Sequence, residues 1–576
     1  MLSKVLRFFP LLQHLEGQTA SGFFADAVGG TVTAILIIPQ AIAYALLAGL
    51  PPQMGLYAAI VAPLAYALVG SSRTVIIGPA AVQSVMVAAT LAPLAGAAVP
   101  VQVAGALAIG MLSGLLLLGL GVLRLGWLTN FISSPVLSGF TTGAVLYIII
   151  TQMGGLLGIA VPQGAAPTAA IATVWHGLGA IKLATAACGV SAVALLFGAR
   201  RAGAHLARLL GWDAEIGKLF GRVSPLAVVA LYAALSTAFD FSHRFGIGVV
   251  GPIPGQLPGF HWVDAGSFDW QAFGTGTLLI TLVAYIETLS VAKALGFRRR
   301  ERIDADREFI ALGVANLFAS AFGGMPVAGS FSKSMVNFEA GARTQLSGIV
   351  AAVWVALCAV LFTGLLHELP KAVLAAIIVV AVSRLIDFAS LRRTWRYDRG
   401  DGAAQAVTIV AVLLLGVELG LLAGSSVAIA LFLYKTSRPR ILVVGHVPGT
   451  QHFRNVERHD VVTFEHLLLI RVDENLYFAN MPRVESELQR LVAEHPRATE
   501  VVLILSGIGY IDASSLDMLD NFEHELSLTG TRLHLAEFKS QVIDRLRGTP
   551  LFERLGPSRV HRSTFDVLQS FDAGVI

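Results

Sequence analysis

The chain has 576 residues, of which 55% are hydrophobic and only 14% are charged, and its formal net charge is +4. Soluble globular proteins carry about 25% charged residues, so lipid must be the solvent for most of this chain. Lys and Arg are scattered over predicted loops, which excludes the basic patch of a nucleic-acid-binding protein. The two cysteines, Cys188 and Cys358, lie in apolar stretches, so we expect neither disulfides nor a zinc site.

Composition divides the chain into three parts. Residues 1–22 form a short N-terminal segment without the pattern of a cleaved signal peptide. Apolar runs dominate residues 23–436, whereas residues 437–576 are rich in charge and contain no run long enough to span a bilayer. We therefore predict a polytopic α-helical transmembrane domain followed by a soluble domain.

Apolar segments separated by turn residues predict fourteen transmembrane segments. They begin near Asp26, Gly55, Pro79, Gln102, Trp127, Ile181, Val223, Thr275, Asp306, Gly329, Thr344, Pro370, Gly402 and Leu419. Several are shorter than the roughly 20 residues of a straight spanning helix. Gly and Pro interrupt the third at 78–79 and the tenth at 326–329.

Loop charge predicts the orientation. The segments 200–222, 298–307 and 384–399 each hold five Lys and Arg residues, and they follow the sixth, eighth and twelfth spans. Cytoplasmic loops are enriched in these residues. We therefore expect a multi-pass protein of the inner (plasma) membrane with both termini in the cytosol. The charge pattern leaves open whether the spans number twelve or fourteen.

The third and tenth spans occupy matching places when the fourteen are split seven and seven. A matching pair of broken segments indicates an inverted-repeat transporter whose substrate lies between two half-helix starts. Helix starts expose unpaired N–H groups and the positive ends of helix dipoles, which suit an anion. The alternative is that Gly and Pro only kink these helices.

Two stretches offer candidate ligands in the first and third spans. In 39–57, Gln40 and Tyr44 are four residues apart and share one helix face. The alternative for this pair is an interhelical hydrogen bond and a packed aromatic ring. In 78–84, the small residues Ala80 and Ala81 would let a ligand approach the backbone amides.

The stretch 326–337 contains the strongest candidate charge. Ser330 and Ser332 offer hydroxyl donors near a predicted helix start, and Lys333 follows them. A charged residue inside a membrane domain is costly and indicates a functional site by default. The alternatives are that Lys333 extends to the interface or pairs with a carboxylate.

The stretch 285–293 places Glu287 well inside the eighth span. A lone carboxylate removed from water can bind and release a proton near neutral pH, as a proton-coupled transporter requires. It could also neutralise Lys333 when no anion is bound. The alternative is a static salt bridge to Lys293 or Lys333.

These stretches, with the following 340–348, resemble the sulfate permease (SulP, solute carrier 26) family of anion transporters. The resemblance covers nearly the whole chain. It implies a seven-plus-seven inverted repeat with a mobile core domain and a gate domain, and an anion site between the third and tenth helices. The implied ligand shell includes Gln40, Tyr44, Ala80, Ala81, Ser332 and Lys333.

The hydrophobic pattern of the C-terminal part differs from that of the membrane part. Segments 441–444, 467–472, 501–505 and 533–538 are typical of short strands, and 481–494, 514–528 and 540–548 of helices. This alternation predicts an α/β domain with a mainly parallel or mixed sheet. The segment resembles the STAS domain, related to anti-sigma-factor antagonists. Ser514 and Ser515 occupy the place of the phosphorylated serine of those antagonists, although a helix cap at Asp512 and Ser514 is the simpler interpretation.

The leading hypothesis is a secondary active transporter of a small anion, most of all sulfate, by proton symport with elevator-type alternating access. Bicarbonate or a C4-dicarboxylate as substrate, anion exchange and a passive anion channel remain alternatives. We expect no enzymatic activity, cofactor, metal or nucleic-acid partner. The expected partners are the anion, protons, the lipid bilayer and a second copy of the chain in a homodimer.

Overall fold

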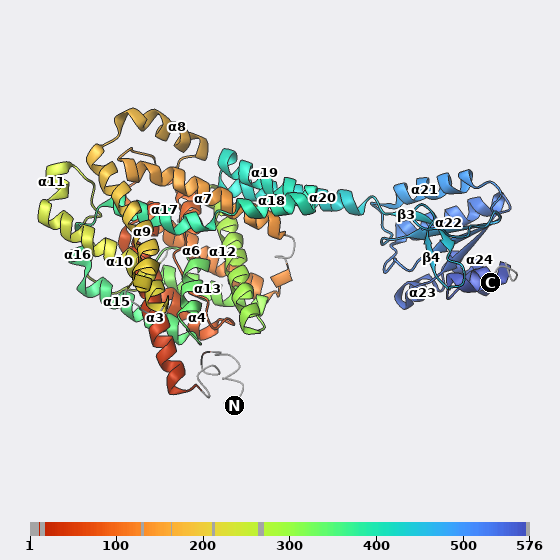
Figure 1. Ribbon diagram of the computed structural model, residues 1–576, viewed down its shortest axis with the longest axis horizontal. Coiled ribbons are helices and arrows are strands. Elements are labelled where there is room, and N and C mark those ends of the chain that lie inside the picture. Colours follow the sequence, from red (N-terminus) through yellow and green to blue (C-terminus); the bar gives the residue numbers. More distant parts are fainter. Residues whose placement is uncertain are drawn as a thin grey trace. The chain divides into compact units, whose positions relative to one another are not determined.

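The computed structural model describes residues 11, 18–127, 132–162, 164–209, 214–262 and 270–571. The predicted N-terminal segment 1–22 therefore lies mostly outside the described residues. The chain divides into two compact units between Ala428 and Ile429, within the helix α20 (Val417–Thr436). Each unit is described by itself below (Figure 1).

The first unit is helical, and each predicted span falls on its own helix. The first seven are α3 (Ala20–Leu47), α4 (Pro52–Val69), α5 (Ala81–Thr90), α6 (Val99–Val122), α7 (Ser134–Leu157), α9 (Leu183–Leu209) and α10 (Ala214–Phe239). The next are α12 (Trp270–Arg299), α13 (Ala305–Ala321), α14 (Phe331–Glu339), α15 (Leu346–Leu361), α17 (Lys371–Val382), α19 (Arg399–Leu415) and α20. Shorter helices between them are α8 (Pro167–Gly177), α11 (Phe241–Phe245), α16 (Thr363–His367) and α18 (Phe388–Tyr397).

Helix length separates these elements into two kinds. Within the described residues, seven helices are long and apolar enough to cross a membrane, or eight if the bent pair Pro167–Ala180 and Leu183–Ala199 is one span. The helices α5 and α14, of 10 and 9 residues, are far too short to cross alone. The number of fourteen spans accordingly stays a prediction.

Helix contacts in the first unit repeat between its two halves. The pair α6 and α13 is matched by α15 and α4, and the pair α5 and α12 by α14 and α3. The contact of α7 with α19 is likewise matched by that of α17 with α9. The two-residue strands β1 (Ile77–Gly78) and β2 (Ala328–Gly329), which precede α5 and α14, pair antiparallel with each other. This is the pattern that an inverted repeat produces.

The same contacts sort the helices into two groups. The first group consists of α3 to α6 and α12 to α15, and the second of α7, α9, α10 and α17 to α19. Figure 1 shows the interleaving of their chain segments, with red and orange helices beside green ones. Small residues permit the closest approaches: a Cβ on Gly55 of α4 would lie 1.9 Å from the carbonyl oxygen of Ala41 in α3.

The second unit contains a six-stranded mixed sheet. Its strands are β3 (Ile441–His446), β4 (Phe453–Asn455), β5 (Leu467–Val472), β6 (Glu500–Ile504), β7 (Arg532–Ala536) and β8 (Val560–His561), in the order β4-β3-β5-β6-β7-β8. The strands β5 to β8 are parallel, and β3 runs antiparallel to both neighbours. Its helices are α21 (Met481–Glu494), α22 (Ala513–Leu528), α23 (Ser540–Leu546), α24 (Pro550–Leu555) and α25 (Thr564–Phe571). The four predicted strands and three predicted helices are thus confirmed.

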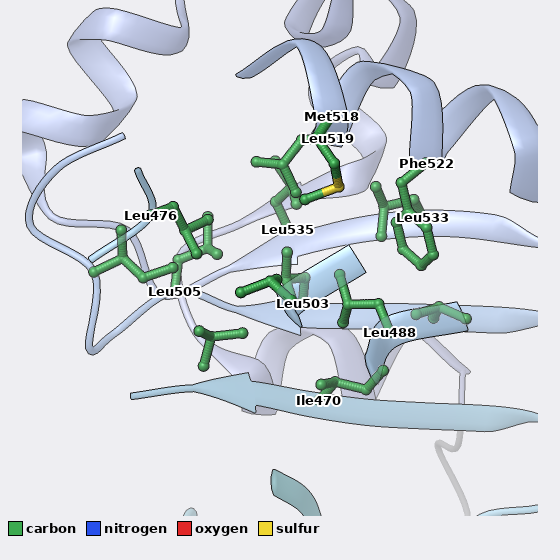
Figure 2. Close-up of a cluster of buried hydrophobic side chains, with 14 of the residues drawn as sticks. Ile470, Leu476, Leu488, Leu503, Leu505, Met518, Leu519, Phe522, Leu533 and Leu535 are labelled. Carbon is green, nitrogen blue, oxygen red and sulfur yellow. The ribbon is translucent and has the colours of Figure 1, made fainter. Parts of the chain in front are cut away.

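Apolar side chains on both faces of the sheet account for this architecture. Figure 2 shows Ile470, Leu503 and Leu535 of the strands directed toward Leu519 and Phe522 of α22. Strand residues that face the other side of the sheet, such as Val502 and Ile504, pack with Val567 and Leu568 of α25. Because successive strand residues face opposite sides, a sheet buried on both faces requires the continuous apolar runs seen in β5 and β6.

Candidate functional site

Two short helices begin side by side at the paired strands β1 and β2. The residue before α5 is Ala80 and the residue before α14 is Ser330, and both have an extended backbone. Neither helix start has a side-chain cap, so the first-turn amides of both are available to a ligand. The antiparallel pairing of the two strands aims both positive helix ends at one region.

Buried amides and hydroxyls fix the two strands. Asn316 of α13 donates to the Val327 carbonyl and accepts from the Val327 amide, both at 3.0 Å. The Thr288 hydroxyl of α12 accepts from the Gly329 amide at 2.7 Å. These contacts hold the backbone that leads into α14.

The strand β1 is held in the same manner from α14 and the residue that precedes α15. The Ser334 hydroxyl accepts from the Ile76 amide at 2.9 Å, and the Asn337 amide donates to the Thr74 carbonyl at 3.1 Å. Gln345 donates to the Val75 carbonyl at 2.9 Å. Residues of the second half of the chain therefore brace the backbone that leads into both helix starts.

Lys333 reaches from α14 to the start of α5. Its side chain is fully buried, and its ammonium donates a hydrogen bond to the carbonyl of Pro79. The same ammonium lies 5.6 Å from the centroid of the Tyr44 ring on α3. Lys333 thus places its amino group beside the two helix starts and does not extend to an interface.

Glu287 faces the same region from α12. Its carboxylate oxygen Oε2 is buried without a hydrogen-bonding partner in the part of the chain that the structure describes. Among those residues it also forms no ion pair with Lys293 or Lys333. The described protein therefore leaves this carboxylate oxygen without a hydrogen bond.

A cavity of about 430 Å³ joins these groups. Six of the eight predicted transport residues line it, namely Tyr44, Ala80, Ala81, Glu287, Ser330 and Ser332. Lys333 lies directly behind its wall, in contact with Tyr44 and Pro79. Gln40 lies one turn before Tyr44, is 1% exposed, and has neither side-chain polar atom bonded within the described residues.

The cavity also has a wall that the sequence did not reveal. Phe140 and Thr141 of α7, Val382 of α17 and the exposed residues Arg384 and Asp387 line it. Arg384 was visible only as one of many loop charges, and Thr141 carried no signal at all. Since α7 and α17 belong to the second helix group, the cavity lies between the two groups.

The predicted regulatory serines of the second unit differ in accessibility. Ser515 is fully buried, and its hydroxyl donates to Asp512 at 2.6 Å while its amide donates to the same carboxylate at 2.8 Å. Ser514 is exposed. Of the two, only Ser514 could meet a kinase in this conformation.

Two family models match the chain, one in each of its two units. The model of the "Sulfate permease family" matches residues 23–408, and that of the "STAS domain" matches residues 455–568. The chain is 32% identical to "Probable sulfate transporter 4.2" of Arabidopsis thaliana, covering 94% of this chain and 80% of that protein.

A bacterial relative and a solved structure are also similar to the chain over nearly its whole length. "Probable sulfate transporter Rv1739c" of Mycobacterium tuberculosis is 32% identical, with 95% of each chain covered. The solved structure described as "The overall structure of SLC26A9" superposes with a TM-score of 0.89 at 20% identity, over 99% of this chain and 95% of that one. At this identity the superposition shows a shared fold: a helical membrane domain followed by a STAS domain.

Proposed function

Because the chain belongs to the sulfate permease family, which is made up of transporters and not enzymes, we propose that it carries a small anion across a membrane. Sulfate is the first candidate, since both relatives above are named as sulfate transporters. Bicarbonate and C4-dicarboxylates would use similar donors and are the competing substrates.

One observation carries the proposal of an anion. Two uncapped helix starts meet at β1 and β2, and the buried ammonium of Lys333 lies beside them. Each helix start is equivalent to roughly half a positive charge, so together with a protonated Lys333 the region bears about two positive charges while Glu287 is neutral. A divalent oxyanion neutralises that charge, and the amides and serine hydroxyls supply its hydrogen bonds.

Small residues in the wall support direct backbone contact. Ala80 and Ala81 line the cavity at the start of α5, and their methyl groups leave the amides of the first turn accessible. Ser330 and Ser332 line the start of α14 and add hydroxyl donors. We propose that Gln40 and Tyr44 complete the shell from α3.

We propose proton symport through Glu287. Its side chain lines the same cavity as the proposed anion site, and its carboxylate oxygen Oε2 has no hydrogen-bonding partner within the described residues. An ionised Glu287 would repel a divalent anion at short range, so binding of the anion favours the protonated acid. Anion and proton then enter the site together.

We propose that transport follows an elevator-type movement of the first helix group against the second. Residues of both groups line the cavity, so relative movement of the groups would change which side of the membrane it faces. The positive loops favour a plasma-membrane protein with a cytosolic N-terminus and STAS domain. The homodimer is proposed from the family resemblance.

Uptake into proteoliposomes tests the function. Labelled sulfate, bicarbonate and succinate would be offered separately, each with and without an imposed pH gradient. We expect saturable sulfate uptake that an inward proton gradient drives above equilibrium. Accumulation of another anion would reassign the substrate, and uptake that requires an internal anion and ignores the proton gradient would indicate exchange. Non-saturating flux would indicate a channel.

A further inference from the structure

A polar contact joins the two helix groups away from the cavity. The hydroxyl of Thr90, at the end of α5, lies 2.9 Å from the carboxylate oxygen Oε1 of Glu418 in α20. The helix α5 belongs to the first group. The first half of α20 packs on α19 of the second group, since a Cβ on Gly420 would lie 2.5 Å from Cα of Val412.

This contact lies toward the end of the unit opposite to the mouth of the cavity. The exposed lining residues Ala294, Arg384 and Asp387 mark the mouth. On α12, Gly276 packs on Thr90: a Cβ there would lie 2.5 Å from the Thr90 hydroxyl. Eighteen residues separate Gly276 from Ala294, which is about 27 Å along a helix and close to the roughly 30 Å of the bilayer core.

Within the described residues, Glu418 has few polar contacts besides Thr90. In the part of the chain that the structure describes, Thr90 is its one hydrogen-bonding partner, and no ion pair reaches it. A half-buried carboxylate that loses hydration for a single hydroxyl contact gains little stability from it. Such a contact is easily broken and remade, as a contact between two moving bodies must be.

We propose that Thr90 and Glu418 form a latch, which holds the two helix groups together on the side away from the mouth. The latch separates when the anion site becomes open to that side. This inference rests on the proposed transport by alternating access. It adds two positioning residues that never touch the anion.

A reversible crosslink tests the latch. In a background with Cys188→Ala and Cys358→Ala, Thr90→Cys and Glu418→Cys would be combined and joined by a short bifunctional methanethiosulfonate reagent. We expect sulfate uptake to fall at least tenfold and to return after reduction, while sulfate binding to the detergent-solubilised protein persists. The matched controls are the two single-cysteine variants treated with the same reagent, which should keep their uptake.

The outcomes are distinct. If the crosslinked double variant transports at the rate of the single variants, the two residues do not separate and the latch is wrong. If the untreated wild type takes up none of the tested anions, the proposed function itself fails, and the latch fails with it.

Conservative variants separate a latch from a merely structural contact. The Thr90 hydroxyl has one hydrogen but two acceptors, Glu418 and the Met86 carbonyl at 2.8 Å. The amide of Glu418→Gln can donate to Thr90 and satisfy both, so this variant and Thr90→Ser should behave as wild type. Thr90→Val should lower the KM for sulfate offered on the latch side about fivefold, because it destabilises the state in which that side is closed. An unchanged KM in Thr90→Val would overturn the proposal.

Discussion

The ammonium of Lys333 and the ring of Tyr44 lie 5.6 Å apart, which joins the start of α14 to the face of α3. Tyr44 lines the cavity, whereas Lys333 is fully buried behind it. A cation beside an aromatic ring is stabilised when desolvated, so the charge can remain in the protein while no anion is bound. The ring therefore stabilises the buried ammonium without neutralising it.

Replacement of this lysine should weaken anion binding. We expect Lys333→Ala to lose the charge-assisted contribution of about 1.5–3 kcal/mol, which raises the Kd for sulfate roughly 10- to 150-fold. Binding to the purified protein by isothermal calorimetry would measure it. Lys333→Met serves as a second variant that fills the buried space.

The matched control is Lys293→Ala, since Lys293 is an exposed lysine on α12. It should bind sulfate as wild type does. Unchanged affinity in both Lys333 variants would remove Lys333 from the site, and equal losses at Lys293 and Lys333 would indicate a nonspecific charge effect.

Glu287 should govern proton coupling and not anion recognition. Glu287→Gln keeps the shape of the side chain but cannot titrate, so we expect sulfate binding to persist while a proton gradient no longer drives accumulation. Proteoliposome uptake with and without the gradient measures this. The control is Glu301→Gln, two residues after the end of α12, which removes a carboxylate paired with Arg73 at 3.5 Å. Gradient-driven accumulation that survives in Glu287→Gln would contradict the symport mechanism.

Asn316 should determine whether the start of α14 keeps its geometry. Asn316→Ala leaves the buried N–H and C=O of Val327 unpaired, each at a cost of about 1–3 kcal/mol. We expect a lower thermal midpoint and weaker sulfate binding, although Asn316 is not among the residues that line the cavity. Asn316→Asp keeps the acceptor and loses the donor, so its effects should be intermediate. Wild-type affinity in Asn316→Ala would show that β2 does not need this brace.

The lining of the cavity could be predicted where its motif is local. The residues Ala80, Ala81, Ser330 and Ser332 are recognisable because small and hydroxylated residues follow Gly or Pro breaks within apolar segments. The strands β1 and β2 were missed, because two residues each carry no period and their pairing joins positions 77 and 329. Asn316 was also missed, although an amide within an apolar helix is itself a signal.

The soluble unit followed its sequence more closely. The predicted helix 481–494 agrees with α21 at both ends, and the four predicted strands correspond to β3, β5, β6 and β7. The strands β4 and β8, of 3 and 2 residues, were not predicted, because so short a segment shows no alternation of apolar and polar residues. They pair only because the neighbouring long strands present their edges.

A histidine pair in the soluble unit should make its stability depend on pH. His534 Nδ1 lies 3.0 Å from His561 Nε2, and His534 Nε2 lies 2.8 Å from Glu500. Burial lowers the pKa of His534 below its ordinary value, against the opposing effect of the Glu500 carboxylate. Burial, and then the charge of His534, lower the pKa of His561 as well. The folded unit therefore favours neutral imidazoles.

Proton linkage gives the direction in which the stability of the soluble unit changes with pH. Below about pH 6.5, the ordinary pKa of histidine, the unfolded chain takes up protons that the folded chain still excludes, so stability falls as the pH drops. We expect a fragment of residues 437–576 to unfold in less urea at pH 5.5 than at pH 7.5. His534→Gln should reduce this difference, whereas His524→Gln, at an exposed position on α22, should not. An equal pH dependence in both variants would exclude the pair as its source.

At the start of α22, one serine is part of the helix cap and the other is exposed and available for phosphorylation. Asp512 accepts hydrogen bonds from the Ser515 amide and hydroxyl, and from the Phe478 amide at 2.7 Å. Asp512→Ala removes this cap and should lower the free energy of unfolding by about 0.5–2 kcal/mol, which urea titration of the same fragment would measure. Ser514→Ala should change it by less than about 0.5 kcal/mol, because exposed side chains rarely matter more. If Ser514→Ala destabilised the fragment as much as Asp512→Ala, Ser514 would be part of the cap and a poor candidate for phosphorylation.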